Sequence, residues 1–167
     1  MDPTEGARAL GRLAAHTNTP MAVVTAAAPD GRRSGCLVGF WTQCSIHPPR
    51  VLACISKTNY TFAVATDAAV LAIHWLGADD RELAELFGGE SGDNVDKFER
   101  CSWHPGPAGV PVLDGAKGWV AGPVAGRFDA GDHVAFVVGA EAGAADEPSA
   151  GELGFLAVKD LEPGHQP

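Results

Sequence analysis

Short apolar runs separated by turn residues are the feature of this sequence that most narrows its possible folds. Pro48 and Pro49 lie between two such runs, and proline cannot donate a hydrogen bond to a β-ladder. The run of β-branched and apolar residues at 21–27 is followed by Pro-Asp-Gly, which is typical of a turn. The predicted strands span 21–27, 34–45, 51–56, 69–76, 118–128, 133–142 and 154–158. Six or more strands with short helices between them favour a mainly β protein, an antiparallel barrel, over alternating βαβ units.

The remaining segments predict a few helices and one loop. Residues 1–16 read as a helix that begins at Asp2-Pro3-Thr4-Glu5, with Leu10 and Leu13 on one face. Shorter helices are predicted at 58–66, 79–87 and 95–100, and a loop at 139–151. A chain of 167 residues then forms one domain, with an N-terminal helix at 1–16, a core at about 17–160 and a tail at 161–167.

Charge and composition exclude several classes of protein. Lys plus Arg number 12 and Asp plus Glu number 21, so the net charge of −9 disfavours nucleic acid as a partner. No run approaches the roughly 20 apolar residues that cross a bilayer, and the acidic start does not resemble a secretory signal. We therefore expect a cytoplasmic protein without a membrane or nucleic-acid partner.

The cysteines are expected to be reduced thiols in buried strands. Cys36, Cys44, Cys54 and Cys101 form no Cys-x-x-Cys pair. Cys44 and His47 have a spacing seen in metal sites, but no second pair of ligands accompanies them. We predict no metal site.

A polar segment after the strand at 51–56 is the candidate anion site. Helix N-termini present unpaired N–H groups and a partial positive charge, which suits a phosphate. Hydroxyl and amide groups, with one lysine, are concentrated there: Ser56, Lys57, Thr58, Asn59 and Thr61. The alternative is an ordinary helix cap with an exposed lysine.

The order of motifs from residue 21 to 142 resembles that of the flavin reductase family, which has the FMN-binding split-barrel fold. Ser45-Ile46-His47-Pro48-Pro49 is similar to the family's Ser-x-x-Pro-Pro, and Ser56-Lys57-Thr58-Asn59-Tyr60-Thr61 is similar to its polar loop before a short helix. Asp96-Lys97-Phe98 and Gly131-Asp132-His133 resemble two later elements of the family. The resemblance implies a split antiparallel β-barrel with a few short helices.

The resemblance also implies roles for individual residues. Those expected along the flavin are Gly39, Phe40, Trp41, Thr42, Gln43 and Ser45, with Phe98 as a further contact. Those expected at its phosphate are Ser56, Lys57, Asn59 and Thr61. His133 falls on the nicotinamide side as the candidate catalytic residue; the alternative is a turn residue that caps a strand.

Three positions depart from the commoner family pattern. The family's Thr-x-Asn-Ser is replaced by Leu37, Gly39 and Phe40, and Trp41 stands where a smaller aromatic is usual. His74 stands where asparagine is frequent, so it either contacts the flavin or is a buried, hydrogen-bonded histidine.

The activity implied by the resemblance is an NAD(P)H-dependent flavin oxidoreductase that binds FMN or FAD and takes hydride from NADH or NADPH. A homodimer is expected, with a flavin-dependent monooxygenase as a possible recipient of reduced flavin. The alternatives are a non-catalytic flavin-binding electron carrier, a split-barrel relative that uses deazaflavin or pyridoxal phosphate, and a scaffold that has lost its cofactor.

Overall fold

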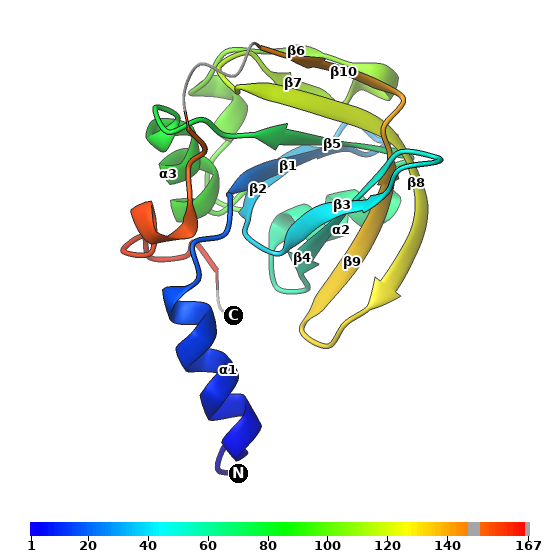
Figure 1. Cartoon of the computed structure of the whole chain (residues 1–167). Coiled ribbons are helices and arrows are strands. Elements are labelled where there is room, and N and C mark those ends of the chain that lie inside the picture. The colour runs from blue at the N-terminus through cyan, green and yellow to red at the C-terminus, as the bar shows by residue number, and fades with distance from the viewer. Residues whose placement is uncertain (147–150, 166–167) are drawn as a thin grey trace.

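The computed structural model describes residues 1–146 and 151–165 and has an antiparallel β-barrel as its body (Figure 1). The main sheet runs in the order β2-β1-β5-β8-β9-β4-β3, and β10 pairs with β8. Its strands are β1 (Ala22–Ala27), β2 (Arg33–Val38), β3 (Trp41–Ser45), β4 (Arg50–Ser56), β5 (Val70–Trp75), β8 (Gly118–Asp129), β9 (His133–Gly139) and β10 (Ala142–Ala145). The fold class predicted from the sequence is confirmed.

Strand β8 joins the two halves of the sheet. Its first half pairs with β5 and its second half with β9, with a register irregularity between Val124 and Gly126. A Cβ on Gly122 would overlap the carbonyl oxygen of Gly139, so only glycine allows the backbone to pass at this crossing. The long strand can therefore bend round the barrel and serve both halves.

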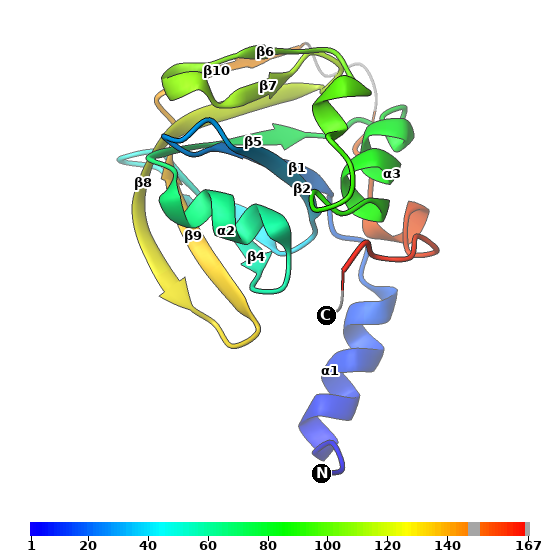
Figure 2. The same cartoon turned by 180° about the vertical axis from the view of Figure 1, so that it is seen from behind.

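Three α-helices in the described part of the chain accompany the barrel, with different relations to it (Figure 2). Helix α2 (Tyr60–Asp67) places Val64 and Ala65 against the barrel interior, with Phe136 and Ile55. Helix α3 (Arg81–Gly89) packs Phe87 in a second apolar cluster outside β1 and β2. Helix α1 (Glu5–His16) projects away from the barrel, and none of its residues is buried. None of the helices in the described part of the chain has the length and apolar character needed to span a bilayer.

Several element boundaries differ from the sequence expectation. The strand expected at 34–45 is two strands, because the chain turns at Gly39 and Phe40. The expected last strand at 154–158 is a 3₁₀ turn, Phe155–Ala157. The expected loop at 139–151 contains β10, and its residues 147–150 lie outside the described part.

Other local features were missed or misplaced. The hairpin of β6 (Trp103–Pro105) and β7 (Pro111–Leu113) was not predicted. Helix α1 is capped by Thr4, whose Oγ1 accepts the Ala7 N–H at 3.2 Å, rather than by Asp2. Of the four thiols only Cys36 is buried, and Cys44 is exposed.

Candidate functional site

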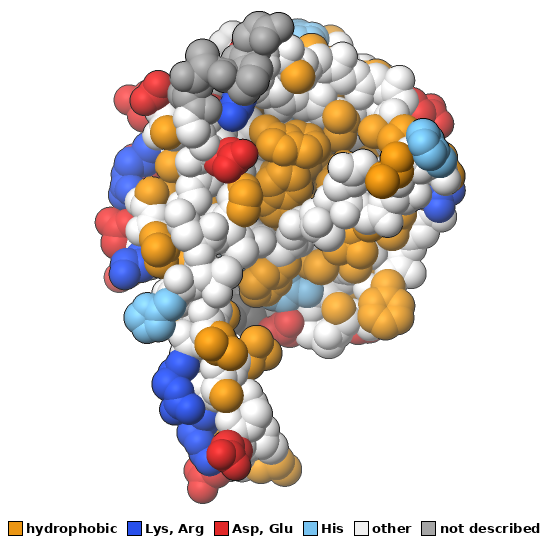
Figure 3. All heavy atoms as spheres, in the orientation of Figure 1, with side chains coloured by type: hydrophobic (Ala, Val, Ile, Leu, Met, Phe, Trp, Pro, Cys, Tyr) orange, Lys and Arg blue, Asp and Glu red, His pale blue; other side chains and the backbone are white. Residues whose placement is uncertain are grey.

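An apolar hollow of about 550 Å³ lies where α1 meets the barrel. Figure 3 shows hydrophobic side chains gathered on this face, at the base of the projecting helix. A volume of roughly 300–1,000 Å³ with apolar walls and a few polar groups is typical of cofactor sites. The hollow is lined from α1 by Leu10, Leu13, Ala14 and Ala15, from the segment between α1 and β1 by Thr17, Thr19 and Met21, from the barrel and its connecting loops by Cys36, Leu37, Val38, Gly39, Phe40, Cys54, Ile55, Ser56, Asn59 and His133, and from the C-terminal part by Phe155 and His165.

The turn between β2 and β3 forms one apolar wall of the hollow. A Cβ on Gly39 would lie in ordinary contact with Sδ of Met21, at 3.4 Å, so a longer side chain there would extend among the residues that line the hollow. Phe40 is 62% exposed, and its carbonyl accepts the Cys54 N–H at 2.9 Å, which fixes the turn against β4. The wall can therefore receive a flat apolar group without a polar side chain in the way.

The polar end of the hollow is built where β4 passes into α2. Ser56 is buried and its Oγ lies 3.0 Å from Oγ1 of Thr58. Asn59 is the N-cap of α2, and its Oδ1 accepts the Thr61 N–H at 2.9 Å. Hydroxyl and amide groups with a helix start next to them are suited to an anion.

His133 stands beside this polar end. It is the first residue of β9 and the cross-strand partner of Ser56. Its Nδ1 lies 2.6 Å from Oδ1 of Asp132, and this hydrogen bond lowers the pKa of the Asp132 carboxyl. Its ring packs against Phe40 with centroids 5.2 Å apart. The imidazole is thus held in a fixed orientation at the edge of the hollow.

Of the residues singled out from the sequence, Gly39, Phe40, Ser56, Asn59 and His133 line the hollow together. The structure places the others elsewhere. Thr42 and Gln43 are exposed on β3, Ser45 ends that strand, and Trp41 donates its Nε1–H to the Pro20 carbonyl at 2.7 Å. None of these four residues lines the hollow. The turn before β3 lines it, whereas β3 itself runs beyond the turn and pairs with β4.

The expected phosphate residues Lys57 and Thr61 also point away. Lys57 Nζ forms an ion pair with Oδ2 of Asp129 at 2.8 Å. The Thr61 hydroxyl is buried and lies 2.8 Å from the Ser34 hydroxyl, on the barrel side of α2. The directions of these two side chains depend on partners that are distant in the sequence, Asp129 for Lys57 and Ser34 for Thr61.

His74 is buried near the end of β5, as one of the two sequence interpretations expected. Its Nδ1 lies 3.0 Å from the Val23 carbonyl, and its Nε2 lies 3.0 Å from the Leu113 nitrogen. Because the Leu113 N–H can only donate, Nε2 is the acceptor and Nδ1 carries the proton. Burial lowers the pKa of His74 to about 4, so the ring is neutral and structural.

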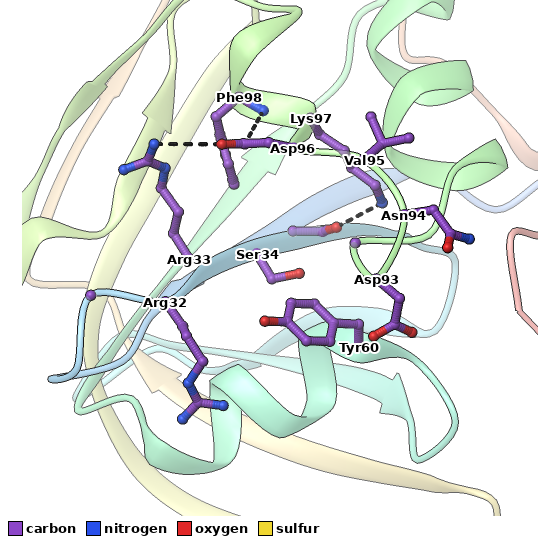
Figure 4. Close-up of a pocket in the computed structure, with 13 residues that line it drawn as sticks. Arg32, Arg33, Ser34, Tyr60, Asp93, Asn94, Val95, Asp96, Lys97 and Phe98 are labelled. Atoms are coloured by element: carbon purple, nitrogen blue, oxygen red, sulfur yellow. Dashed lines mark hydrogen bonds and ion pairs between the residues drawn. The ribbon is translucent and has the colours of Figure 1, made fainter.

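A second hollow, of about 420 Å³ and polar, lies beside β2 and contains Phe98 (Figure 4). Arg33 is 3.7 Å from Asp96, and Arg32 is paired with Asp30 and Asp67. Lys97 is buried, which lowers its pKa, and its Nζ donates to the carbonyls of Gly35 and Phe87 at 3.0 and 3.1 Å. Since these cations already have partners in the chain, this hollow is held together by internal contacts.

Comparison with known proteins gives one consistent family. The model of the flavin reductase like domain matches residues 14–159. The reductase subunit Stc3 of stachydrine N-demethylase from Rhizobium meliloti is 29% identical over 71% of this chain and 50% of its own. The FMN reductase (NADH) RutF of Stutzerimonas stutzeri is 32% identical over 65% of this chain and 59% of its own. The chain thus spans about half the length of the curated relatives it matches.

A solved structure has the same fold over most of both chains. The NADH:FAD oxidoreductase SgcE6 of Streptomyces globisporus superimposes with a TM-score of 0.79, over 91% of this chain and 89% of its own, at 24% identity.

Proposed function

Because this chain belongs to the flavin reductase like family, we propose that it is an NAD(P)H-dependent flavin oxidoreductase that binds FMN or FAD in the hollow beneath α1. The observation that carries the proposal is the combination in one cavity of an apolar wall, a polar end at Ser56 and Asn59, and an oriented imidazole at His133. The relatives named FMN reductase (NADH) and NADH:FAD oxidoreductase support both cofactors.

The side chains that line the hollow suit a flavin. Leu37, Val38 and Phe40 offer apolar surface to a ring system, and Gly39 leaves that surface open. Ser56 and Asn59 lie at the end where a phosphate could be bound, next to the start of α2. Of the residues predicted from the sequence, this proposal uses those that line the hollow.

When bound, flavin supplies the hydride acceptor, and the protein supplies binding, orientation and exclusion of water. Phe40 and His133 lie together at the edge of the hollow, where a nicotinamide would approach. The bond from His133 to Asp132 holds the imidazole in one orientation, so it can position a polar group of the nicotinamide without moving.

Titration of the purified protein with FMN and FAD, followed by addition of NADH or NADPH, tests this function. Flavin fluorescence should be quenched on binding, and absorbance at 340 nm should then fall steadily. A protein that binds flavin without oxidising either nucleotide would be the non-catalytic carrier instead. The absorbance spectrum of the purified protein identifies a deazaflavin or pyridoxal phosphate.

A matched pair of variants ties the activity to the hollow. Gly39→Leu places a branched side chain in the apolar wall and should abolish flavin binding. Gly126→Leu adds the same side chain at a glycine whose Cβ position has no heavy atom within 4 Å, and should bind flavin as the parent protein does. Equal binding by both variants would show that the flavin lies elsewhere.

We propose that two copies associate through α1. Leu10 and Leu13 are 67% and 69% exposed on a helix with no buried residue, and Phe40 is exposed beside them at the hollow. Exposure of such an apolar face to water is unfavourable, and association with a second copy of the chain buries it. Leu10→Glu with Leu13→Glu should yield monomers by light scattering, whereas Arg12→Glu should not.

The proposal includes a cytoplasmic protein that passes reduced flavin to a monooxygenase. A relative from Salmonella typhimurium is named as the reductase component of 4-hydroxyphenylacetate 3-monooxygenase, which supports a monooxygenase partner. The free thiols of Cys36, Cys44, Cys54 and Cys101 suit a reducing compartment. A coupled assay with a flavin-dependent monooxygenase, in which substrate hydroxylation follows NAD(P)H oxidation, tests the transfer.

A further inference from the structure

Few basic side chains line the hollow beneath α1. Its lining residues all lie in the described part of the chain, and the basic side chains among them are His133 and His165. A flavin phosphate carries at least one negative charge, and a buried anion is costly unless a positive group or hydrogen-bond donors surround it. The charge at the polar end must therefore come from an imidazole or from backbone dipoles.

Lys57, the cation expected from the sequence, is directed to the opposite side of its loop. Its Nζ is 2.8 Å from Asp129, on the β8–β9 hairpin, and this contact lowers the pKa of the Asp129 carboxyl. Its backbone N–H donates to the Asp132 carbonyl at 2.9 Å, which fixes the residue in that direction. Lys57 is outside the lining of the hollow.

His133 is held in place by contacts within the chain. Its Nδ1 lies 2.6 Å from Oδ1 of Asp132. Its ring packs against Phe40, with centroids 5.2 Å apart. The other imidazole that lines the hollow belongs to His165.

His165 reaches the polar end from the C-terminal segment. The Gly164 N–H donates to the Gly88 carbonyl at 3.3 Å, near the end of α3, and so holds the C-terminal segment against that helix. Nδ1 of His165 lies 3.3 Å from Oγ1 of Thr58, and that hydroxyl lies 3.0 Å from Oγ of Ser56. The imidazole therefore adjoins the hydroxyl groups at which a phosphate would lie.

We propose that His165 binds the phosphate of the flavin and closes that end of the hollow. The proposal rests on the proposed function, since it names a further binding residue of the same site. The protonated imidazole donates a charge-assisted hydrogen bond to a phosphate oxygen, beside Ser56 and the amides of the loop. The C-terminal segment, expected from the sequence only as a tail, thus supplies a binding group at residue 165.

Comparison of FMN with riboflavin, which lacks the phosphate, tests the role of His165 in the full-length protein. Affinities are measured by flavin fluorescence quenching in mildly acidic buffer, where imidazoles in general are cationic. His165→Gln should weaken FMN binding roughly tenfold, equivalent to about 1.4 kcal/mol, and leave riboflavin binding unchanged. His165→Lys should restore FMN affinity, because it returns a cation. His104→Gln, which removes an imidazole on β6, serves as the matched control.

The binding measurements distinguish failure of the role of His165 from failure of the proposed function. Unchanged FMN affinity in His165→Gln overturns the inference but not the proposed function. Equal losses for FMN and riboflavin also overturn it, because the tail would then shape the hollow rather than bind phosphate. If the parent protein binds neither flavin, the proposed function fails and this inference fails with it.

Discussion

His74 makes the stability of this protein depend on pH in a predictable way. The ring is 0% exposed, and both nitrogens are bonded to the backbone, Nδ1–H to Val23 and Nε2 from the Leu113 N–H. Protonation of Nε2 would abolish its role as acceptor and bury an uncompensated charge. The pKa accordingly falls from 6.5 to about 4 on folding.

The direction of the effect follows from where the proton binds. Below pH 6.5 the unfolded chain takes up a proton at this position, whereas the folded chain does not until about pH 4. The stabilisation is therefore complete above about pH 6.5 and is lost as the pH falls toward 4. Between pH 7.5 and 5.0 this one residue should lower the free energy of unfolding by about 2 kcal/mol.

The substitution His74→Asn isolates this contribution. Asparagine does not titrate, and it can replace only part of the two hydrogen bonds, so the variant should be about 1–3 kcal/mol less stable at pH 7.5. The gap between the two proteins should then narrow by about 2 kcal/mol at pH 5.0. Urea unfolding followed by tryptophan fluorescence measures both values, and His16→Asn on exposed α1 should leave the pH dependence unaltered. Parallel pH curves for the parent protein and His74→Asn would refute the reasoning.

Other substitutions test the packing. Lys97→Met leaves two buried carbonyls without their donor and should cost about 2–4 kcal/mol in urea unfolding; an unchanged midpoint would contradict the described contacts. Gly122→Ala drives a methyl group into the Gly139 carbonyl and should destabilise the protein by about 3 kcal/mol or more, measured as a fall in melting temperature. The Cys36 thiol, whose pKa burial raises to about 11, should resist iodoacetamide at pH 8 while exposed Cys44 is alkylated. Peptide mass spectrometry distinguishes the two thiols, and labelling of Cys36 in the native protein would count against its burial.

The strand pattern of the barrel could be predicted because most strands are apolar or β-branched and end at clear turn residues. β1 and β4 are examples, since Pro-Asp-Gly follows the first and Pro48-Pro49 precedes the second. The turn at Gly39 and Phe40 could not be predicted, because the alternating pattern of side chains continues through it. β10 and the β6–β7 hairpin are short, and their formation depends on a partner strand rather than on composition.

The candidate site was predictable as segments but not as side-chain directions. The loop after β4 and the start of β9 do meet, with Ser56 opposite His133. The direction of Lys57 depends on Asp129, more than 70 residues later in the sequence, at the other end of an ion pair. Leu10, Leu13 and His165 were not recognised as lining residues, because a projecting helix and a tail give no local signal of the cavity that they share with the barrel.

The hydrogen bond from Lys57 to Asp132 and the pairing of Ser56 with His133 join the loop after β4 to the β8–β9 hairpin. A change in the hairpin is therefore transmitted to the loop after β4, and a change in the loop to the hairpin. Substitutions in the two segments should be non-additive, so a library that alters the binding properties of either one needs to randomise both together.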